Sequence, residues 1–138
     1  MNNDKFFLDL LLPETLISRK FDKQSCLYSY YKNAGLVDVK TRPYFLNLYS
    51  KFLSKIDLFI EKYKATKIID LGCGIGTTAL YCGMKNYKYI GIDIDEESIS
   101  IAKKRIEKLS KITQSFIKPN LYLMDCSNLS KINDQFNF

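Results

Sequence analysis

Residues 70–76 read DLGCGIG, and this stretch decides the fold because it stands where a short apolar run gives way to a helical pattern. The run Lys67–Leu71 is typical of a strand that is buried on both faces of a parallel sheet. Glycines directly after such a strand let the backbone bend tightly and let a ligand approach main-chain atoms that a Cβ would shield. The pattern predicts a binding turn, with a purely structural turn as the alternative when the glycines are taken alone.

Strand and helix patterns alternate after this turn. We expect a short helix over residues 77–83 that stops at Gly83, a second strand over Lys88–Asp93 and a third strand over Leu121–Met124. Strands that are separated by helices pair in parallel, so the sequence predicts an α/β fold.

The segment between the second and third strands has the marks of an amphipathic helix. Asp95 is a good N-cap, and Glu96 and Glu97 suit the positive start of a helix. The predicted buried stripe consists of Ile99, Ala102, Ile106 and Leu109, and the basic residues expected near the negative end are Lys103, Lys104, Arg105 and Lys108.

The front of the chain reads as helical. Residues 4–18 and 22–33 give short helical patterns, and the stretch from Pro43 to Tyr63 predicts a longer amphipathic helix. The apolar stripe of that helix is Phe45, Leu48, Tyr49, Phe52, Ile56, Phe59, Ile60 and Tyr63. Because the residues that carry chemistry follow position 66, we expect a helical segment, 1–65, that packs on a ligand-binding half-domain, 66–138.

An acidic residue near the glycine turn indicates the charge of the ligand. Asp70, two positions before Gly72, would repel a phosphate but favour a cationic amino group or a sulfonium, with a strand-end cap as the alternative. A dinucleotide fingerprint that starts at Gly72 needs glycine or alanine at position 77, where this chain has Thr77. A fingerprint that starts at Gly74 meets this requirement, because Ala79 is its third small residue.

Two further strand ends carry acids. Asp93 lies 21 positions after Gly72, which matches the separation of about 20 residues at which an acid reaches a ribose hydroxyl. Asp125 and Cys126 offer a carboxylate acceptor and a backbone N–H beside the expected place of a base, although Asp125 read alone is a turn residue. Three successive strand ends with acids predict an adenosine-type ligand whose other end is cationic.

Composition narrows the chemistry. None of the 138 residues is histidine, which excludes histidine-based triads within the chain. The four cysteines, Cys26, Cys73, Cys82 and Cys126, form no CxxC pair, so we expect no metal site and reduced thiols. No apolar stretch approaches the roughly 18 residues that span a bilayer, and no signal-peptide pattern is present, so we expect a cytoplasmic protein without a membrane partner.

The formal net charge is +6, which attracts nucleic acid in some proteins. Of the 21 basic residues all but Arg19, Arg42 and Arg105 are lysine, and they are scattered along the chain. This pattern favours the compositional bias of an AT-rich genome over a surface selected for binding. Nucleic acid is kept as an alternative partner.

Three segments carry a family resemblance: IIDLGCGIGTTAL (68–80), YIGIDIDEESISIAKKR (89–105) and LYLMDCSNL (121–129). They resemble the first, second and third strand motifs of class I S-adenosylmethionine-dependent methyltransferases. The resemblance covers about residues 66–130. It implies a Rossmann-like fold, S-adenosylmethionine as cofactor and methyl transfer to an unidentified acceptor.

The resemblance also implies roles for individual residues. The backbone of Gly72, Cys73, Gly74 and Gly76 would cradle the methionine part of the cofactor beside Asp70. Asp93 would bind the ribose hydroxyls, Ile94 would pack on the adenine, and Asp125 and the Cys126 N–H would contact the adenine edge. In-line displacement at the sulfonium methyl needs no covalent protein intermediate, and no catalytic residue is assigned.

The sequence departs from the family at its end. The family sheet has seven strands with the first at its centre, whereas residues 134–138 resemble only the opening of the fourth. We therefore expect a parallel sheet that is truncated after the third strand and has the first strand as an edge. Either the sequence is a fragment of a longer protein, or a second chain completes the sheet.

Two alternatives to the enzyme stay open. One is a non-catalytic module of the same fold that binds the cofactor or a partner, and the other is aminopropyl transfer as in polyamine synthases. Arg42 is a candidate for pairing with the methionine carboxylate. Tyr28, Tyr30, Tyr31 and Tyr44 are candidates for lining an acceptor pocket, although aromatic residues near helices are more often core.

Overall fold

The structure, a computed structural model, describes residues 42–132, with side chains from residue 47 to residue 130. The expected helices at 4–18 and 22–33, Cys26, Tyr28, Tyr30, Tyr31 and the opening of a fourth strand at 134–138 lie outside the described residues, as do the side chains of Arg42 and Tyr44. The chain divides into two compact units, Met1–Ala65 and Thr66–Phe138.

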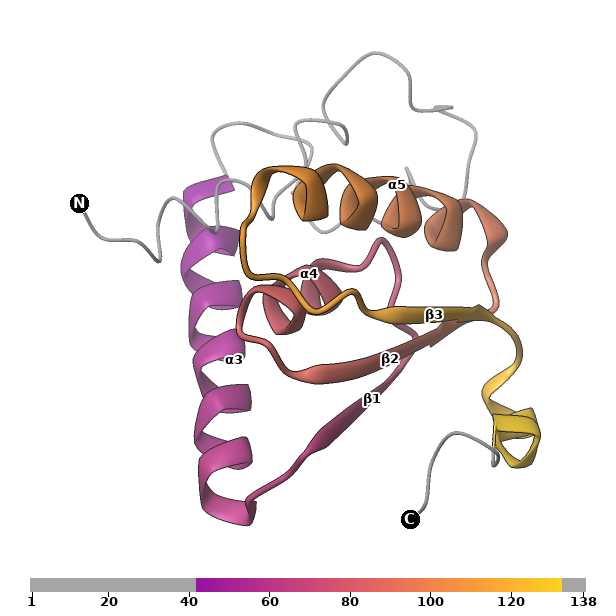
Figure 1. Cartoon of the computed structure of the whole chain (residues 1–138), viewed down its shortest axis with the longest axis horizontal. Helices are drawn as coiled ribbons and strands as arrows, with labels where there is room; N and C mark the ends of the chain where they lie inside the picture. Colours follow the sequence, from indigo (N-terminus) through magenta and orange to yellow (C-terminus); the bar gives the residue numbers. More distant parts are fainter. Residues whose placement is uncertain (1–41, 133–138) are drawn as a thin grey trace. The chain divides into compact units, whose positions relative to one another are not determined.

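The second unit holds a three-stranded parallel sheet (Figure 1). Its strands are β1 (Lys67–Leu71), β2 (Lys88–Asp93) and β3 (Asn120–Leu123), in the order β1-β2-β3. The first two strands have the predicted bounds, and β3 begins and ends one residue earlier than predicted. The predicted parallel α/β sheet is confirmed, and within the described residues it ends after its third strand.

The position of β1 corrects one expectation about burial. Lys67 and Leu71 are exposed and the residues between them are half-buried, so β1 is not a strand buried on both faces. It forms one edge of the described sheet, as the comparison with a seven-stranded fold predicts, and its outer backbone groups have no neighbouring strand there. β2 is the central strand, and its Ile90 and Ile92 side chains are buried.

Two helices lie on one side of this sheet and contact each other (Figure 1). The longer, α5 (Glu96–Ile112), begins at Asp95, whose carboxylate accepts the Ser98 N–H at 2.8 Å, as predicted. The predicted stripe of Ile99, Ala102, Ile106 and Leu109 is buried throughout. Of the basic residues near its end only Lys111 lies in the last turn, because the helix continues to Ile112.

The shorter helix, α4 (Thr77–Met84), does not stop at Gly83. Gly83 lies inside the last turn, and a Cβ there would come within 2.5 Å of the Phe116 ring. The glycine is needed for this close packing, and the left-handed residue that follows the helix is Asn86, with φ 60°. Cys126–Ile132 form a short 3-10 segment, η2, after β3.

The first unit contributes α3 (Arg42–Tyr63), close to the predicted bounds. Its predicted stripe is only partly buried, because Phe52, Phe59 and Tyr63 are more than half exposed. Among the described side chains of α3, from residue 47 on, Leu53 is the buried one, and the predicted stripe omits it. Phe59 and Tyr63 instead stack on each other, with ring centroids 5.7 Å apart, as residues four apart on a helix surface do. Within the described residues no helix is long and apolar enough to cross a membrane.

Candidate functional site

The carboxyl ends of the three parallel strands meet at one edge of the sheet. Leu71 pairs with Ile92, and Asp93 pairs with Leu123, so the ends are nearly level. The three predicted acids lie at this edge: Asp70 near the end of β1, Asp93 at the end of β2, and Asp125 just after β3. The glycine turn lies at the same edge and joins β1 to α4.

The turn is held in a tight, left-handed path. Gly72, Gly74 and Gly76 have φ values of 81°, 52° and 76°, which residues with a Cβ rarely adopt. The N–H groups of Gly72 and Cys73 both donate to the Ile92 carbonyl, at 2.8 and 3.0 Å. The turn is thereby tied to the neighbouring strand rather than left free to find its shape on binding.

Two of these glycines have different surroundings. A Cβ on Gly72 would meet no atom within 4 Å, so this part of the turn faces open space. A Cβ on Gly76 would lie 2.8 Å from the Ala102 Cβ, so Gly76 lets α5 approach the turn. The close approach of a ligand to the backbone, which the sequence predicts for the whole turn, has room at Gly72.

Asp93 holds the turn and the start of α5 together. Its Oδ2 accepts the Gly74 N–H at 2.7 Å, and its Oδ1 accepts the Asp95 N–H at 2.9 Å. These bonds fix the orientation of the carboxylate, and each oxygen keeps a second lone pair for a hydroxyl donor.

Asp70 has a partner that the sequence reasoning missed. The Tyr89 hydroxyl donates to its Oδ2 at 2.6 Å. Tyr89 is buried, and its pKa is raised far above the ordinary range, first by burial and then by the Asp70 charge, so the hydroxyl stays protonated. The register carries a signal for this pair: Asp70 pairs with Gly91, and Tyr89 is its diagonal neighbour, within reach of an aromatic side chain.

Cys73 is a packing residue in this arrangement. Its side chain is buried, and a Cβ on Gly91 would lie 2.8 Å from its Sγ. Burial, followed by the negative charges of Asp70 and Asp93, raises the pKa of the Cys73 thiol to about 12. The thiol is therefore neutral at physiological pH.

The third strand end has the geometry of a turn. The Asp125 Oδ1 accepts the Ser127 N–H at 2.8 Å, and this bond lowers the pKa of the exposed Asp125 carboxyl. Cys126 is exposed and begins η2. Ile94, the residue after Asp93, is 73 % exposed and presents an apolar surface at the same edge.

Arg105 is a second residue that the sequence reasoning misplaced. It was expected to complement the end of α5, but its guanidinium donates to the Ile75 carbonyl at 2.6 Å and to the Thr77 hydroxyl at 3.3 Å. It thereby fixes the far side of the glycine turn. Its position three residues after Ala102, which contacts the turn at Gly76, places it on the same helix face.

Comparison with known proteins gives matches along both units. The family model described as a methyltransferase domain matches residues 62–138. A tRNA (guanine-N(7)-)-methyltransferase of Mycoplasma genitalium is 33% identical over 105 residues, which are 76% of this chain and 44% of that protein. A 23S rRNA (uracil(747)-C(5))-methyltransferase of Pyrococcus abyssi is 35% identical over 65 residues, 47% of this chain and 15% of that protein. The chain thus spans less than half the length of these relatives.

A solved structure shares the fold. The magnesium protoporphyrin IX methyltransferase of Synechocystis PCC 6803, solved with bound SAM, aligns with a TM-score of 0.51 and 16% identity over 88% of this chain and 54% of that one. Together, a parallel sheet with a glycine turn at its carboxyl edge and a family match over more than half of the residues lead to one conclusion: the chain belongs to the methyltransferase domain family.

Proposed function

We propose that this chain binds S-adenosylmethionine at the carboxyl edge of its sheet and serves methyl transfer. The observation that carries the proposal is the pair Asp70 and Asp93, two carboxylates on either side of a glycine turn whose Gly72 faces open space. Each carboxylate is held by the protein through bonds that leave lone pairs for a ligand. Two fixed negative charges favour a ligand that carries an ammonium and a sulfonium.

The residues present fit this cofactor. The backbone of Gly72, Cys73, Gly74 and Gly76 would accommodate the methionine part, with Asp70 near its cationic groups. Asp93 would accept hydrogen bonds from the ribose hydroxyls, and the exposed Ile94 would cover one face of the adenine. Asp125 and the Cys126 N–H are proposed for the adenine edge. A family match to a methyltransferase domain supports this set.

The chemistry proposed for the chain is positioning. When bound, S-adenosylmethionine would supply a methyl group on a sulfonium: a lone pair of the acceptor would attack the methyl carbon in line, and the electron pair of the broken C–S bond would return to sulfur. The Asp93 and Arg105 contacts would hold the turn in one conformation before binding, so little ordering is needed when the ligand arrives. Cys73 remains neutral and takes no part as a nucleophile.

The acceptor and the rest of the protein also belong to this proposal. The relatives named above modify ribosomal RNA, transfer RNA and a porphyrin, so the family is compatible with several acceptor classes. We further propose that residues 66–138 bind the cofactor, that residues 1–65 pack on them, and that the open edge of β1 takes a further strand from this protein or a second chain.

Calorimetry with two ligands tests the charge argument. Titration of the folded chain with S-adenosylmethionine and S-adenosylhomocysteine is expected to show binding of both. Asp70→Asn keeps an acceptor for the Tyr89 hydroxyl but removes the charge, so it is expected to weaken binding of the sulfonium ligand about tenfold more than binding of the neutral thioether. Glu61→Gln, which removes an exposed charge on α3, is the matched control.

Each result has a defined meaning. Failure of the folded chain to bind either ligand contradicts the proposed cofactor site. Equal weakening of both ligands by Asp70→Asn contradicts the electrostatic role of Asp70. Binding of both ligands without methyl transfer to any RNA, protein or porphyrin acceptor in the complete protein would favour a non-catalytic module.

A further inference from the structure

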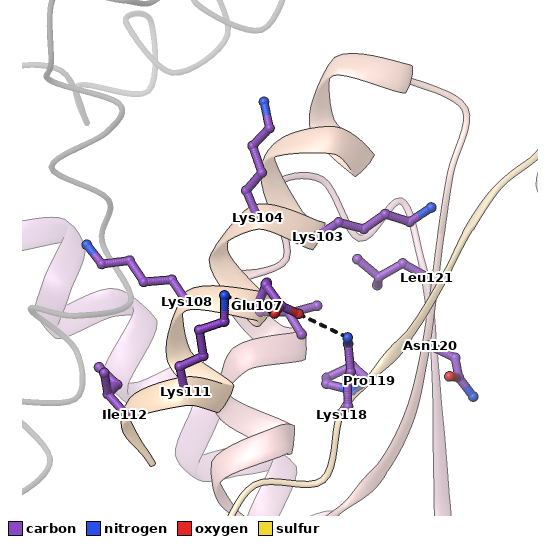
Figure 2. Close-up of a pocket in the computed structure, with 11 residues that line it drawn as sticks. Lys103, Lys104, Glu107, Lys108, Lys111, Ile112, Lys118, Pro119, Asn120 and Leu121 are labelled. Carbon is purple, nitrogen blue, oxygen red and sulfur yellow. Dashed lines mark hydrogen bonds and ion pairs between the residues drawn. The ribbon is translucent and has the colours of Figure 1, made fainter.

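A basic hollow lies on the second unit, away from the carboxyl edge of the sheet. It has a volume of about 850 Å³ and is formed by the second half of α5 and the segment that enters β3. Figure 2 shows Lys103, Lys104, Lys108 and Lys111 on the helix and Lys118 on the opposite segment. Ile106 and Pro119 are buried in its lining, which gives the hollow an apolar floor under a rim of lysines.

The positive charge of this hollow is only partly balanced. Among the described residues that line it, Glu107 is the one acidic residue, and its carboxylate pairs with Lys111 and with Lys118, each at 3.2 Å. The described part of the chain gives Lys103, Lys104 and Lys108 no ion pair. Five lysines against one glutamate leave a formal excess of four positive charges around the hollow.

The helix dipole does not account for these lysines. Its effect falls off within the last turn of a helix, where only Lys111 lies. Lys104 and Lys108 are four residues apart on one helix face, an arrangement of like charges that destabilises a helix. An anionic partner would relieve this repulsion.

The basic surface continues along the amino ends of the strands. Lys118 also lines a second, smaller hollow of about 150 Å³, together with Lys67 and Lys88. Lys67 and Lys88 pair directly across β1 and β2, which brings two further lysines together at the amino ends of these strands. The sheet is thus polarised, with acids at its carboxyl edge and lysines at its amino edge. We call the seven lysines 67, 88, 103, 104, 108, 111 and 118 the lysine track.

We propose that the lysine track binds the sugar–phosphate backbone of single-stranded RNA. Residues 103–111 of α5 extend over about 12 Å at about 1.5 Å per residue, a length of three to four nucleotides at about 3.4 Å each. A hollow with an apolar floor accepts a flexible single strand, whereas a duplex presents a rigid convex surface. Single-stranded segments are also the form in which RNA is most often recognised.

Other polyanions fit the track less well. A membrane surface is bound by several protruding apolar side chains with basic residues beside them, but of the described apolar residues that line this hollow Ile106 and Pro119 are buried and Ile112 alone is exposed. The centres of protein–protein interfaces are depleted of lysine, so the composition of this hollow does not favour a protein partner. The proposal does not depend on the cofactor site, because RNA binding is measured without S-adenosylmethionine.

Fluorescence anisotropy with a labelled 16-nucleotide single-stranded RNA tests the track in the full chain. The variant Lys103→Gln, Lys104→Gln, Lys108→Gln removes the three charges that form no ion pair within the described residues. It is expected to weaken binding at least about tenfold at 100 mM salt and to reduce the slope of log K against log salt by about two, as the loss of three phosphate contacts predicts. The matched control, Lys51→Gln, Lys55→Gln, Lys62→Gln, removes the same charge from exposed positions on α3 and is expected to change affinity less than about twofold.

The outcomes separate the proposal from general charge attraction. Equal weakening by the two triple variants overturns it, because the effect would then follow net charge alone. Competition by phosphatidylserine vesicles at a lower concentration than by unlabelled RNA also overturns it, in favour of a membrane surface. The proposal is supported if the variant of Lys103, Lys104 and Lys108 melts at the wild-type temperature by circular dichroism and still binds RNA more weakly than the α3 control variant does.

Discussion

The Asp93 carboxylate at the end of β2 accepts the Gly74 N–H of the turn after β1 at 2.7 Å. One side chain therefore fixes the ligand-facing turn and presents an acceptor beside it. The same carboxylate accepts the Asp95 N–H at 2.9 Å, which joins the start of α5 to the arrangement. The residue that the sequence assigns to a ribose is also a structural residue of the glycine turn.

Replacing Asp93 is expected to affect stability and binding together. Asp93→Ala removes the acceptor of two backbone N–H groups and the proposed acceptor of the ribose, so binding of S-adenosylmethionine should weaken by about 1–3 kcal/mol in calorimetry. Asp95→Ala is the control, because it removes a helix cap at a cost of about 1 kcal/mol in unfolding free energy without removing a proposed ligand contact. Unchanged affinity in Asp93→Ala would remove this residue from the cofactor site.

Two glycines of the turn should separate stability from binding. Gly72→Ala and Gly76→Ala both place a Cβ at positive φ, but only at Gly76 would that atom lie 2.8 Å from the Ala102 Cβ. We expect Gly76→Ala to lower the free energy of unfolding in urea by about 1–3 kcal/mol more than Gly72→Ala. Gly72→Ala should instead weaken cofactor binding, since its Cβ would occupy the open space over the turn. The reverse order of stabilities would contradict the packing role of Gly76.

Loss of the Tyr89 hydroxyl should cost stability through Asp70. Tyr89→Phe keeps the buried ring but leaves the partly buried carboxylate without this donor, which is expected to lower the free energy of unfolding by about 1–3 kcal/mol. The control is Tyr63→Phe, whose side chain is mostly exposed and whose stacked ring is retained, and a change within about 0.5 kcal/mol is expected there. Similar denaturation midpoints for the two variants would show that the Tyr89–Asp70 bond contributes little.

The neutral thiol of Cys73 predicts a pH dependence. Its pKa is raised in the folded chain from 9.0 to about 12, so the unfolded chain loses this proton first as the pH rises. The contribution of Cys73 to stability is complete below pH 9 and declines between pH 9 and about pH 12. Urea denaturation of wild type and Cys73→Ala measures it: the difference in unfolding free energy between them should shrink across this range.

Alkylation gives an independent measurement of the same thiol. Iodoacetamide at pH 8 is expected to label the exposed Cys126 in the native chain and to spare Cys73 until the chain is unfolded. Peptide mass spectrometry distinguishes the two sites. Rapid labelling of Cys73 in the folded chain would contradict both its burial and its raised pKa.

Local patterns in the sequence determined the order of the elements. The apolar runs predict β1 and β2 with their observed bounds, and Asp95 caps α5 as its type and position indicate. The sequence also placed the glycine turn and the acids at successive strand ends, and parallel pairing brings those ends to one edge of the sheet. These features depend on residues that are close in sequence or on rules that hold for any parallel sheet.

The tertiary structure alone decided which side chains meet. Tyr89 reaches Asp70 across 19 residues, and Arg105 reaches Ile75 across 30, through a strand register and a helix placement that no short window contains. Lysines that look scattered in the sequence gather around one hollow because α5 and the segment before β3 pack side by side. The exposure of Phe52 and Phe59 on α3 has the same reason: periodicity shows which residues share a helix face, but only packing decides what covers that face.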